Sequence, residues 1–199
     1  MIVGLTGGIG SGKTTVAKLF EIMNCIIYNS DERAKEIYFK PQVKASVIEL
    51  LGEQAYSSNN TLNKDYIAKA VFSNSELLQK LNAIIHPAVK QDFEEFVAKQ
   101  NPTQIILKET ALLFEADIYK QVDFSILVTA PTELRIKRVK KRNSITEDEI
   151  KNRINAQWSD EQKIPLANFV IYNNDKEALI PQVITILNSI KNSKNKKAP

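Results

Sequence analysis

A glycine-rich segment near the N-terminus is the first candidate for chemistry. Residues 7–14 read GGIGSGKT and match the pattern G-x-x-x-x-G-K-[S/T] in full, between an apolar run and a helical pattern. Glycines let the backbone amides turn inward around phosphate oxygens, and the following helix adds the positive end of its dipole. In such loops the lysine, here Lys13, contacts the β- and γ-phosphates, and the hydroxyl of Thr14 is placed to ligate Mg²⁺. The segment therefore predicts a nucleotide site.

Arginine is concentrated in one part of the chain. Of five arginines, four lie within 19 residues: Arg135, Arg138, Arg142 and Arg153. The first three are spaced to share one face of a helix that we expect to start with Pro131 in its first turn and to run through Arg142. Arginine binds phosphate in a bidentate manner, and a kinase needs a lid that closes over the phosphates and excludes water. We predict that this helix belongs to such a lid; the alternative is a solvated basic face.

Asp31 is the candidate general base. It follows the apolar run Cys25–Tyr28, so we expect it at the carboxyl end of a strand, the edge where open α/β sheets bind ligands. A carboxylate there can accept or orient the proton of an attacking hydroxyl. Asp31 also opens a helical pattern, and from the residues alone a helix cap is an equally good interpretation.

The other motifs narrow the reaction class. A GTPase would need an N-K-x-D segment, and residues 63–65 (NKD) lack its spacing. A mechanical ATPase would usually be longer and would have a D-E-type pair of acidic residues at the end of an apolar strand. Here the run Gln104–Leu107 is followed by Lys108 and Glu109, which are not such a pair. A small-molecule kinase is therefore the leading class.

The scaffold is predicted from apolar runs that alternate with helical patterns, the signature of a parallel sheet covered by helices. The candidate strands are Ile2–Leu5, Cys25–Tyr28, Gln104–Leu107, Phe124–Val128 and Phe169–Tyr172. About 75 residues without a strand separate the second from the third, too many for one crossover helix, so they predict a helical insert. Capping-box spacing marks two helix starts, Ser73 with Glu76 and Thr146 with Glu149.

Charge and composition exclude several classes of partner. The chain has 199 residues, a net charge of +4 and a pI near 9.0, which favours a nucleic-acid binder at first sight. Four of the 27 lysines and arginines lie in residues 191–199, however, which leaves 23 basic against 23 acidic residues in 1–190. Within that balanced part, residues 135–142 hold six positive charges and no acid. We therefore expect phosphate binding at that helix and no nucleic-acid partner.

No apolar run approaches the length of about 18–20 residues that spans a bilayer, and the N-terminus lacks a secretory signal. The single cysteine, Cys25, suits a reducing compartment and is expected in the core. We accordingly predict a cytoplasmic protein with no membrane contact. The sequence gives no oligomeric state.

Taken together, these motifs resemble the dephospho-CoA kinase family from Ile2 to about Asn173. Residues 4–13 (GLTGGIGSGK) are similar to its phosphate loop, Asp31 to the second aspartate of its D-A-D segment, residues 81–87 to its L-N-x-x-x-H-P and residues 112–115 to its P-L-L-F-E. Six later residues fall at the family's spacing: Pro131, Arg138, Arg142, Arg153, Gln157 and Lys163. Five positions depart from its pattern: Asn29, Lys35, Ala111, Asn168 and Tyr172.

The resemblance implies a P-loop NTPase fold of the α/β class: a five-stranded parallel sheet flanked by helices, with a helical insert and a helical lid. It implies transfer of phosphate from ATP, with Mg²⁺, to the ribose 3′-hydroxyl of dephospho-CoA, which yields coenzyme A. The catalytic residues would be Asp31, Lys13 and Arg142. The nucleotide would be held by Gly10, Ser11, Gly12, Lys13, Thr14, Thr15, Arg138, Arg142 and Asn173, Mg²⁺ by Thr14, and the acceptor by Asp31, His86 and Glu115.

The expected organisation has a nucleotide-binding core (1–34, 102–134 and 166–190), a helical CoA region (35–101), a lid (135–165) and a flexible basic tail (191–199). Since His86 precedes Pro87, we expect it outside helical geometry, either as a buried turn residue or in the acceptor pocket. Three other functions stay open. They are a nucleoside-monophosphate-type kinase, an ATP-binding regulatory module and a nucleic-acid binder.

Overall fold

The structure is a computed structural model that describes residues 1–72, 74–142 and 145–195. The chain forms two compact units, here called the core unit (residues 1–29 and 101–199) and the helical unit (residues 30–100). The predicted boundaries after residues 34 and 101 fall slightly later than those of the structure. Each unit is described by itself.

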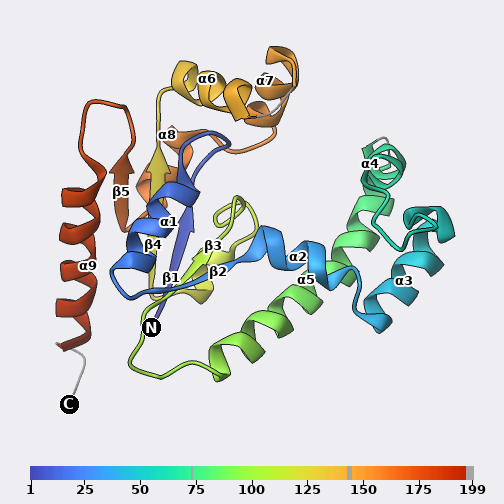
Figure 1. Cartoon of the computed structure of the whole chain (residues 1–199), viewed down its shortest axis with the longest axis horizontal. Helices are drawn as coiled ribbons and strands as arrows, with labels where there is room; N and C mark the ends of the chain where they lie inside the picture. Colours follow the sequence, from blue (N-terminus) through green and yellow to red (C-terminus); the bar gives the residue numbers. More distant parts are fainter. Residues whose placement is uncertain (73, 143–144, 196–199) are drawn as a thin grey trace. The chain divides into compact units, whose positions relative to one another are not determined.

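The core unit is built on five parallel strands, as predicted (Figure 1). They are β1 (Ile2–Thr6), β2 (Ile26–Asn29), β3 (Ile106–Glu109), β4 (Phe124–Thr129) and β5 (Phe169–Tyr172). Their order is β2-β3-β1-β4-β5, with β1 in the centre. The carboxyl ends of all five strands therefore lie at one edge, with the end of β1 in its middle.

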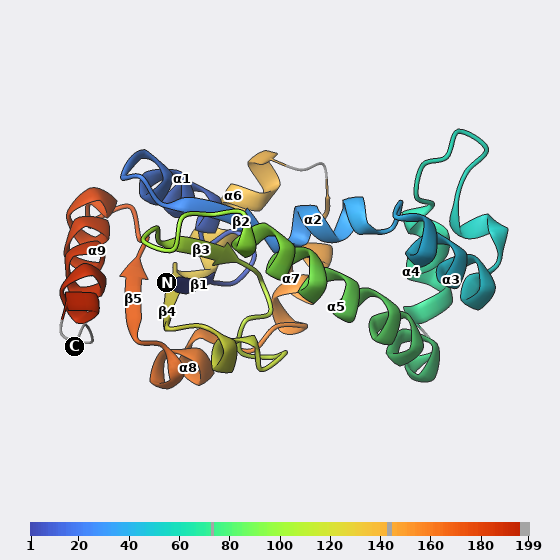
Figure 2. The same cartoon turned by 90° about the horizontal axis from the view of Figure 1, so that it is seen from below.

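Helices cover the sheet on both sides. Helices α1 (Lys13–Ile22) and α9 (Leu179–Asn195) pack against one another and against the sheet, and Figure 2 shows α1 and the short α8 (Asp160–Lys163) on opposite sides of the strands. The core under α1 and α9 is apolar and includes Leu5, Phe20, Ile126 and Val183, all fully buried. Burial of this surface is the main force that holds the sheet and helices together.

The third strand ends two residues later than predicted. The predicted strand ends at Leu107, before the charged residues Lys108 and Glu109, and this end is wrong. Both residues are 5% exposed, and Glu109 is paired in register with Leu5 of β1 and with Asn29 of β2. A strand between two neighbours extends as long as both can pair with it, and its last side chain is then carried to the carboxyl edge.

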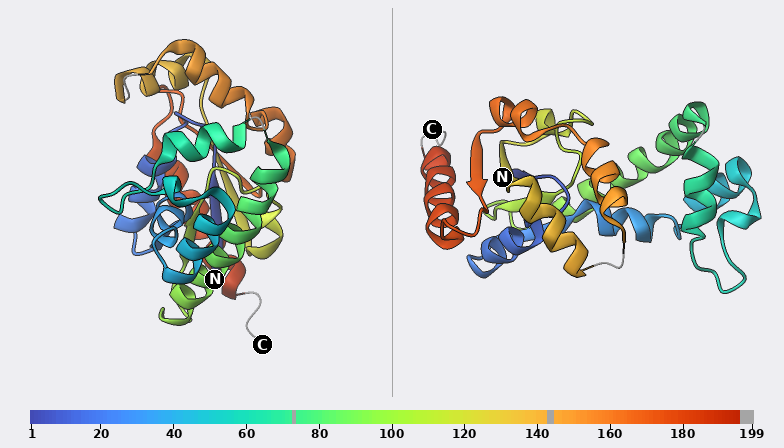
Figure 3. Two further views of the ribbon diagram at one scale, coloured as in Figure 1. Left: turned by 90° about the vertical axis from the view of Figure 1, so that its right-hand side faces the viewer. Right: turned by 90° about the horizontal axis from the view of Figure 1, so that it is seen from above.

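The segment between β4 and β5, whose described part is largely helical, contains the residues predicted as a lid, 135–165; their role as a lid stays a prediction. It contains α6 (Thr132–Arg142), α7 (Glu147–Asn155), α8 and the 3-10 turn η3 (Ile164–Leu166); α6 and α7 are adjacent helices (Figure 3). The capping box of Thr146 and Glu149 is confirmed at the start of α7. Pro131 lies just before α6, where its carbonyl accepts the amide of Arg135.

A second 3-10 turn among the described residues of the core unit, η2 (Ile118–Gln121), lies between β3 and β4.

The helical unit consists of α2 (Ser30–Ile37), α3 (Pro41–Leu51), the turn η1 (Glu53–Ala55), α4 (Lys64–Phe72) and α5 (Ser75–Ala98). It has its own apolar cluster, which includes Ile37, Val47, Leu81 and Ile85. The helical insert predicted for this region is confirmed. The predicted cap Ser73 lies outside the described residues, and α5 is capped by Asn74, whose side chain accepts the amide of Leu77.

Pro87 does not end its helix. We expected His86 to leave helical geometry, but α5 runs from Ser75 to Ala98 with Pro87 inside it. Proline removes one amide donor, and packing on both sides of the proline, by Ile85 and Phe93, keeps the helix continuous. His86 is therefore an exposed helical residue and not a buried turn residue.

The tail is partly helical. The predicted flexible segment 191–199 begins inside α9, which extends to Asn195; residues 196–199 lie outside the described part of the chain. No helix among the residues that the structure describes is long and apolar enough to cross a membrane.

Ion pairing to the buried carboxylate of Asp92 fastens α2 to α5 within the helical unit. The guanidinium of Arg33 donates two hydrogen bonds of 2.8 Å to the carboxylate of Asp92, and the ammonium of Lys40 lies 3.2 Å from the same carboxylate. The side chain of Asp92 is only 5% exposed, so these cations compensate its loss of hydration. Asp31, two residues before Arg33, lies on the helix that this pair holds.

Replacing Asp92 should therefore loosen the helical unit. We expect Asp92→Ala to lower the free energy of unfolding by about 2–3 kcal/mol, because charge-assisted hydrogen bonds are lost and their donors are left without an acceptor. Urea unfolding followed by circular dichroism measures this change. Glu94→Ala, on an exposed face of the same helix, is the control and should change stability by less than about 0.5 kcal/mol. Equal effects of the two substitutions would contradict this account of the ion pair.

Candidate active site

The phosphate loop connects β1 with α1 and is shaped by its own lysine. Lys13 is the first residue of α1, and its ammonium donates a 2.7 Å hydrogen bond to the carbonyl of Gly7 at the opposite end of the loop. Gly12, just before the helix, has a φ of 96°. Residues 10–12 thus lead directly into the N-terminus of α1, whose first residues are Lys13, Thr14 and Thr15 and where backbone amides favour anions.

The segment after β5 supports the loop from one side. The side-chain amide of Asn173 donates a 2.7 Å hydrogen bond to the carbonyl of Ser11. A Cβ atom on Gly12 would lie 2.1 Å from the same amide nitrogen, so this close approach requires glycine. Asn173 was predicted as a nucleotide-binding residue, and the structure places it against the phosphate loop.

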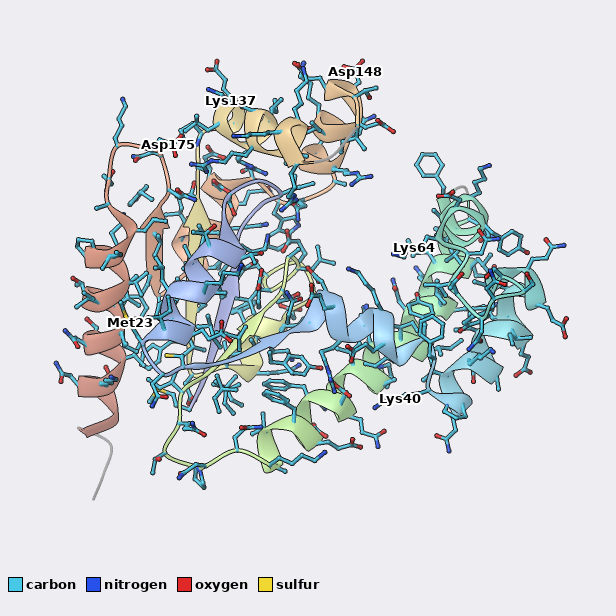
Figure 4. All side chains as sticks on the ribbon, in the orientation of Figure 1. Met23, Lys40, Lys64, Lys137, Asp148 and Asp175 are labelled. Carbon is cyan, nitrogen blue, oxygen red and sulfur yellow. The ribbon has the colours of Figure 1, made fainter. Side chains whose placement is uncertain are left out.

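Arg138 of α6 holds Asn173 in turn. Its Nη2 atom donates to the backbone and side-chain oxygens of Asn173, at 3.0 and 3.2 Å, and forms an ion pair with Asp175. Figure 4 shows Asp175 in the loop between β5 and α9. The structure thus brings together the predicted residues Arg138, Asn173, Ser11 and Gly12.

A carboxylate that the sequence analysis did not select lies beside the loop. The hydroxyl of Thr14 donates to one oxygen of Glu109 at 3.3 Å, and the amide of Asn29 donates to the other at 3.3 Å. A signal was available, because Glu109 follows an apolar run and could be expected at the carboxyl edge. A predicted strand that ends at Leu107 leaves Glu109 outside the sheet and hides this signal.

These oxygens suit a magnesium ion. Mg²⁺ prefers oxygen ligands, keeps several waters, and is commonly held by one or two protein groups and substrate phosphates. Because the hydroxyl proton of Thr14 points to Glu109, a lone pair of its oxygen stays available for a cation. No group of three or more His, Cys, Asp or Glu side chains with metal-binding potential occurs in the described residues. The available ligand set therefore fits an ion bound largely through nucleotide and water.

The predicted arginine face divides into three environments. The side chain of Arg135 is 7% exposed, that of Arg138 is 27% exposed, and Arg142, the last residue of α6, is exposed. Burial lowers the pKa of Arg135, and the nearby carboxylate of Asp160 partly opposes this shift; the guanidinium remains charged at physiological pH. The inner end of the face is thus buried and only its outer end is exposed, so the alternative of a wholly solvated basic face does not hold; the role as a lid stays a prediction.

Glu115 is bound by other protein groups. One of its carboxylate oxygens lies 2.7 Å from the ammonium of Lys163, which is fully buried, and accepts the amide of Trp158 at 3.1 Å. Glu115 was predicted to bind the acceptor. In the structure its contacts fix the segment of residues 157–163.

The remaining predicted residues lie in the helical unit. Helix α2 begins at Ser30, so Asp31 occupies its first turn and is not its cap; the side chain is exposed. Asp31 follows the end of β2 by two residues. His86 is exposed on α5. Their predicted catalytic and acceptor-binding roles stay predictions.

Cys25 lies in the apolar core, as expected. The side chain is buried, and desolvation raises the pKa of its thiol to about 11. The thiol is therefore protonated near neutral pH, which makes it a poor nucleophile.

A cavity of about 570 Å³ is formed by the end of β4, the start of α6 and residues between 154 and 164. Its lining includes Pro131, Trp158 and Tyr172, with Arg135 and Asp160 among the polar groups, and contains no residue of the phosphate loop. The cavity is thus distinct from the predicted phosphate site, although Arg135 belongs to the surroundings of both.

Comparison with known proteins agrees with this geometry. The family model for dephospho-CoA kinase matches residues 1–178. A dephospho-CoA kinase from Bacteroides fragilis is 38% identical over 186 residues, which cover 93% of this chain and 90% of the relative. Another, from Chlorobium chlorochromatii, is 38% identical over 181 residues, with coverages of 87% and 85%.

Proteins of known structure share the fold. A Thermus thermophilus protein superposes with a TM-score of 0.84 at 28% identity and covers 97% of both chains. For a dephospho-CoA kinase from Campylobacter jejuni the TM-score is 0.71 at 20% identity, covering 97% and 98% of the two chains. A shikimate kinase from Bacteroides thetaiotaomicron, with a TM-score of 0.53 at 14% identity, covers 96% and 98% and shares the general fold. From the match over residues 1–178 and the curated relatives, the chain belongs to the dephospho-CoA kinase family.

Proposed function

We propose that this chain transfers the γ-phosphate of ATP to the ribose 3′-hydroxyl of dephospho-CoA, which yields ADP and coenzyme A. Membership of the dephospho-CoA kinase family carries this proposal. The intact phosphate loop, with its lysine, its threonine and a neighbouring carboxylate, supports it. The cytoplasmic location and the absence of nucleic-acid partners stay predictions.

The phosphate loop and α6 supply positive charge in this proposal. Amides from Gly10 to Thr15 surround the phosphates, and Lys13 exchanges its bond to Gly7 for the β- and γ-phosphate oxygens. Arg142, exposed at the end of α6, stabilises the charge on the transferred group. Asn173 borders the nucleotide through its contact with the loop, and Arg138 through its contact with Asn173. Each group acts by electrostatics that strengthen when water is excluded.

Thr14 and Glu109 would hold Mg²⁺ at the start of α1. Glu109 orients the hydroxyl of Thr14 and adds a negative charge that balances the cation. When bound, Mg²⁺ neutralises negative charge that develops on the phosphate oxygens. Asn29 contributes a neutral hydrogen bond to Glu109, so the carboxylate has a fixed orientation.

Asp31 is the proposed general base. Its carboxylate accepts or orients the proton of the 3′-hydroxyl as that oxygen attacks the γ-phosphorus. Residues 35–101, which include His86 and lie mostly in the helical unit, are the proposed CoA region, and residues 135–165 are the proposed lid. Glu115 acts indirectly in this proposal, because its contacts fix the segment of residues 157–163. Its direct contact with the acceptor stays a prediction.

An acceptor screen tests the proposed function. Purified protein with ATP and Mg²⁺ should release ADP when dephospho-CoA is added and not when nucleoside monophosphates are added, as measured by a coupled assay. Lys13→Ala protein, purified identically, controls for contaminating kinases. Its rate of ADP release should be lower by a factor of about 10²–10³. Activity with nucleoside monophosphates alone would favour the other kinase class, and tight ATP binding without transfer would favour a regulatory module.

Asp31→Asn tests the proposed base. The amide keeps the shape of the side chain but cannot accept the proton, so turnover should fall by about 10²–10⁴. Glu32→Gln, the neighbouring exposed residue in the same turn, is the matched control and should retain turnover within about twofold. Retention of more than about a tenth of wild-type turnover by Asp31→Asn would show that the assignment is wrong.

Glu109→Gln tests the carboxylate beside Thr14. The substitution removes the charge that balances Mg²⁺, so we expect the Mg²⁺ concentration for half-maximal activity to rise by about 10-fold or more. Titration of ADP release with Mg²⁺ at saturating ATP measures this. Glu21→Gln, an exposed acid near the other end of α1, should not shift the titration. An unchanged midpoint in Glu109→Gln would remove Glu109 from the magnesium site.

A further inference from the structure

Ile9, at the tip of the phosphate loop, is held by its backbone from two directions. Its carbonyl accepts a 2.9 Å hydrogen bond from Nε of Arg135, in α6. Its amide donates a 2.9 Å hydrogen bond to the side-chain oxygen of Gln157, which follows α7. Both backbone groups of this residue are thus satisfied by side chains from the segment between β4 and β5.

The arginine is itself held in place. Its guanidinium faces the carboxylate of Asp160 at 4.0 Å, and the other oxygen of that carboxylate accepts the hydroxyl of Thr129 at the end of β4. A Cβ atom on Gly8 would lie 2.1 Å from Nη2 of Arg135, so the loop backbone is packed directly on the guanidinium. With 7% of its side chain exposed, Arg135 is fixed by packing as well as by hydrogen bonds.

Gln157 is anchored through its neighbours. The next residue, Trp158, donates its amide to Glu115, and Glu115 binds the buried ammonium of Lys163. The segment of residues 157–163 is therefore tied to the rest of the core unit at both of its ends. A segment fixed in this way can impose a position on the loop tip.

We propose that Arg135 and Gln157 are positioning residues that set the shape of the phosphate loop through Ile9. Ile9 precedes the loop residues assigned to the phosphates, so the clamp leaves the amides from Gly10 onward available to the nucleotide. Arg135 is then separate in function from Arg138 and Arg142, although all three share one helix face. The proposal rests on the nucleotide site of the proposed function but not on its acceptor.

A positioning role and a phosphate contact predict different nucleotide preferences. A group that binds the γ-phosphate contributes to ATP binding and little to ADP binding. A group that shapes the loop affects both nucleotides alike, because both place their β-phosphate in the loop. Loss of one charge-assisted hydrogen bond corresponds to a decrease in affinity of about 10–100-fold.

Direct binding of ATP and of ADP, each with Mg²⁺ and without acceptor, provides the test. We expect Arg135→Leu to raise both dissociation constants by about 10-fold or more, and Gln157→Leu, which loses a neutral hydrogen bond, to raise them by about 3–10-fold, in each case by equal factors for the two nucleotides. In steady state, the KM for ATP should rise while that for dephospho-CoA stays within about twofold. Lys137→Leu, which removes an exposed positive charge from the same helix, is the control for general electrostatics and should leave both constants within about twofold.

Gln157→Leu keeps the proposal testable if Arg135→Leu, which leaves Asp160 without its cation, does not fold. Weakening of ATP but not of ADP would make Arg135 a γ-phosphate ligand and overturn the inference. Unchanged constants in Gln157→Leu, or an equal loss in Lys137→Leu, would overturn it as well. Failure of the wild-type protein to bind either nucleotide would instead reject the proposed function.

Discussion

The phosphate loop must keep its amides directed at a common centre before any anion is there to hold them. Its glycines make this arrangement costly, because they give up more backbone freedom on folding than other residues. In this chain the cost is offset by contacts at three points: Lys13 closes the loop onto Gly7, Asn173 binds the carbonyl of Ser11, and two side chains bind Ile9. The order of the strands makes this possible, since β1 lies beside β4, and β4 leads into α6.

The arginines of α6 show how one sequence pattern can serve several purposes. Spacings of three and four residues place Arg135, Arg138 and Arg142 on one face, but exposure increases along the helix away from the sheet. The innermost guanidinium binds backbone and packs against glycine, the middle one orders the segment after β5, and the outermost is exposed. Periodicity describes the face of a helix and contains no information on how far each turn lies from the neighbouring sheet.

The sequence was sufficient to predict the loop, the five parallel strands and the helical insert, because each depends on local pattern and composition. It was less informative where tertiary contacts decide. Lys108 and Glu109 extend β3 because strands on both sides pair with it, and Pro87 stays inside α5 because flanking residues pack. The clamp on Ile9 has no local signal, since Arg135 lies 126 residues away in sequence; Glu109 had one, but its role beside Thr14, 95 residues away, shows only in the folded chain.

The buried pair of Lys163 and Glu115 limits how this segment can change over evolutionary time. Loss of either partner alone leaves an uncompensated charge in the interior, at a cost of about 3–5 kcal/mol, whereas replacement of both by apolar residues of similar volume can be nearly neutral. Such a cost is a large share of the total stability of a typical domain. Single substitutions at these two positions are therefore barriers, and a lineage reaches an apolar pair only through a destabilised intermediate or a simultaneous change.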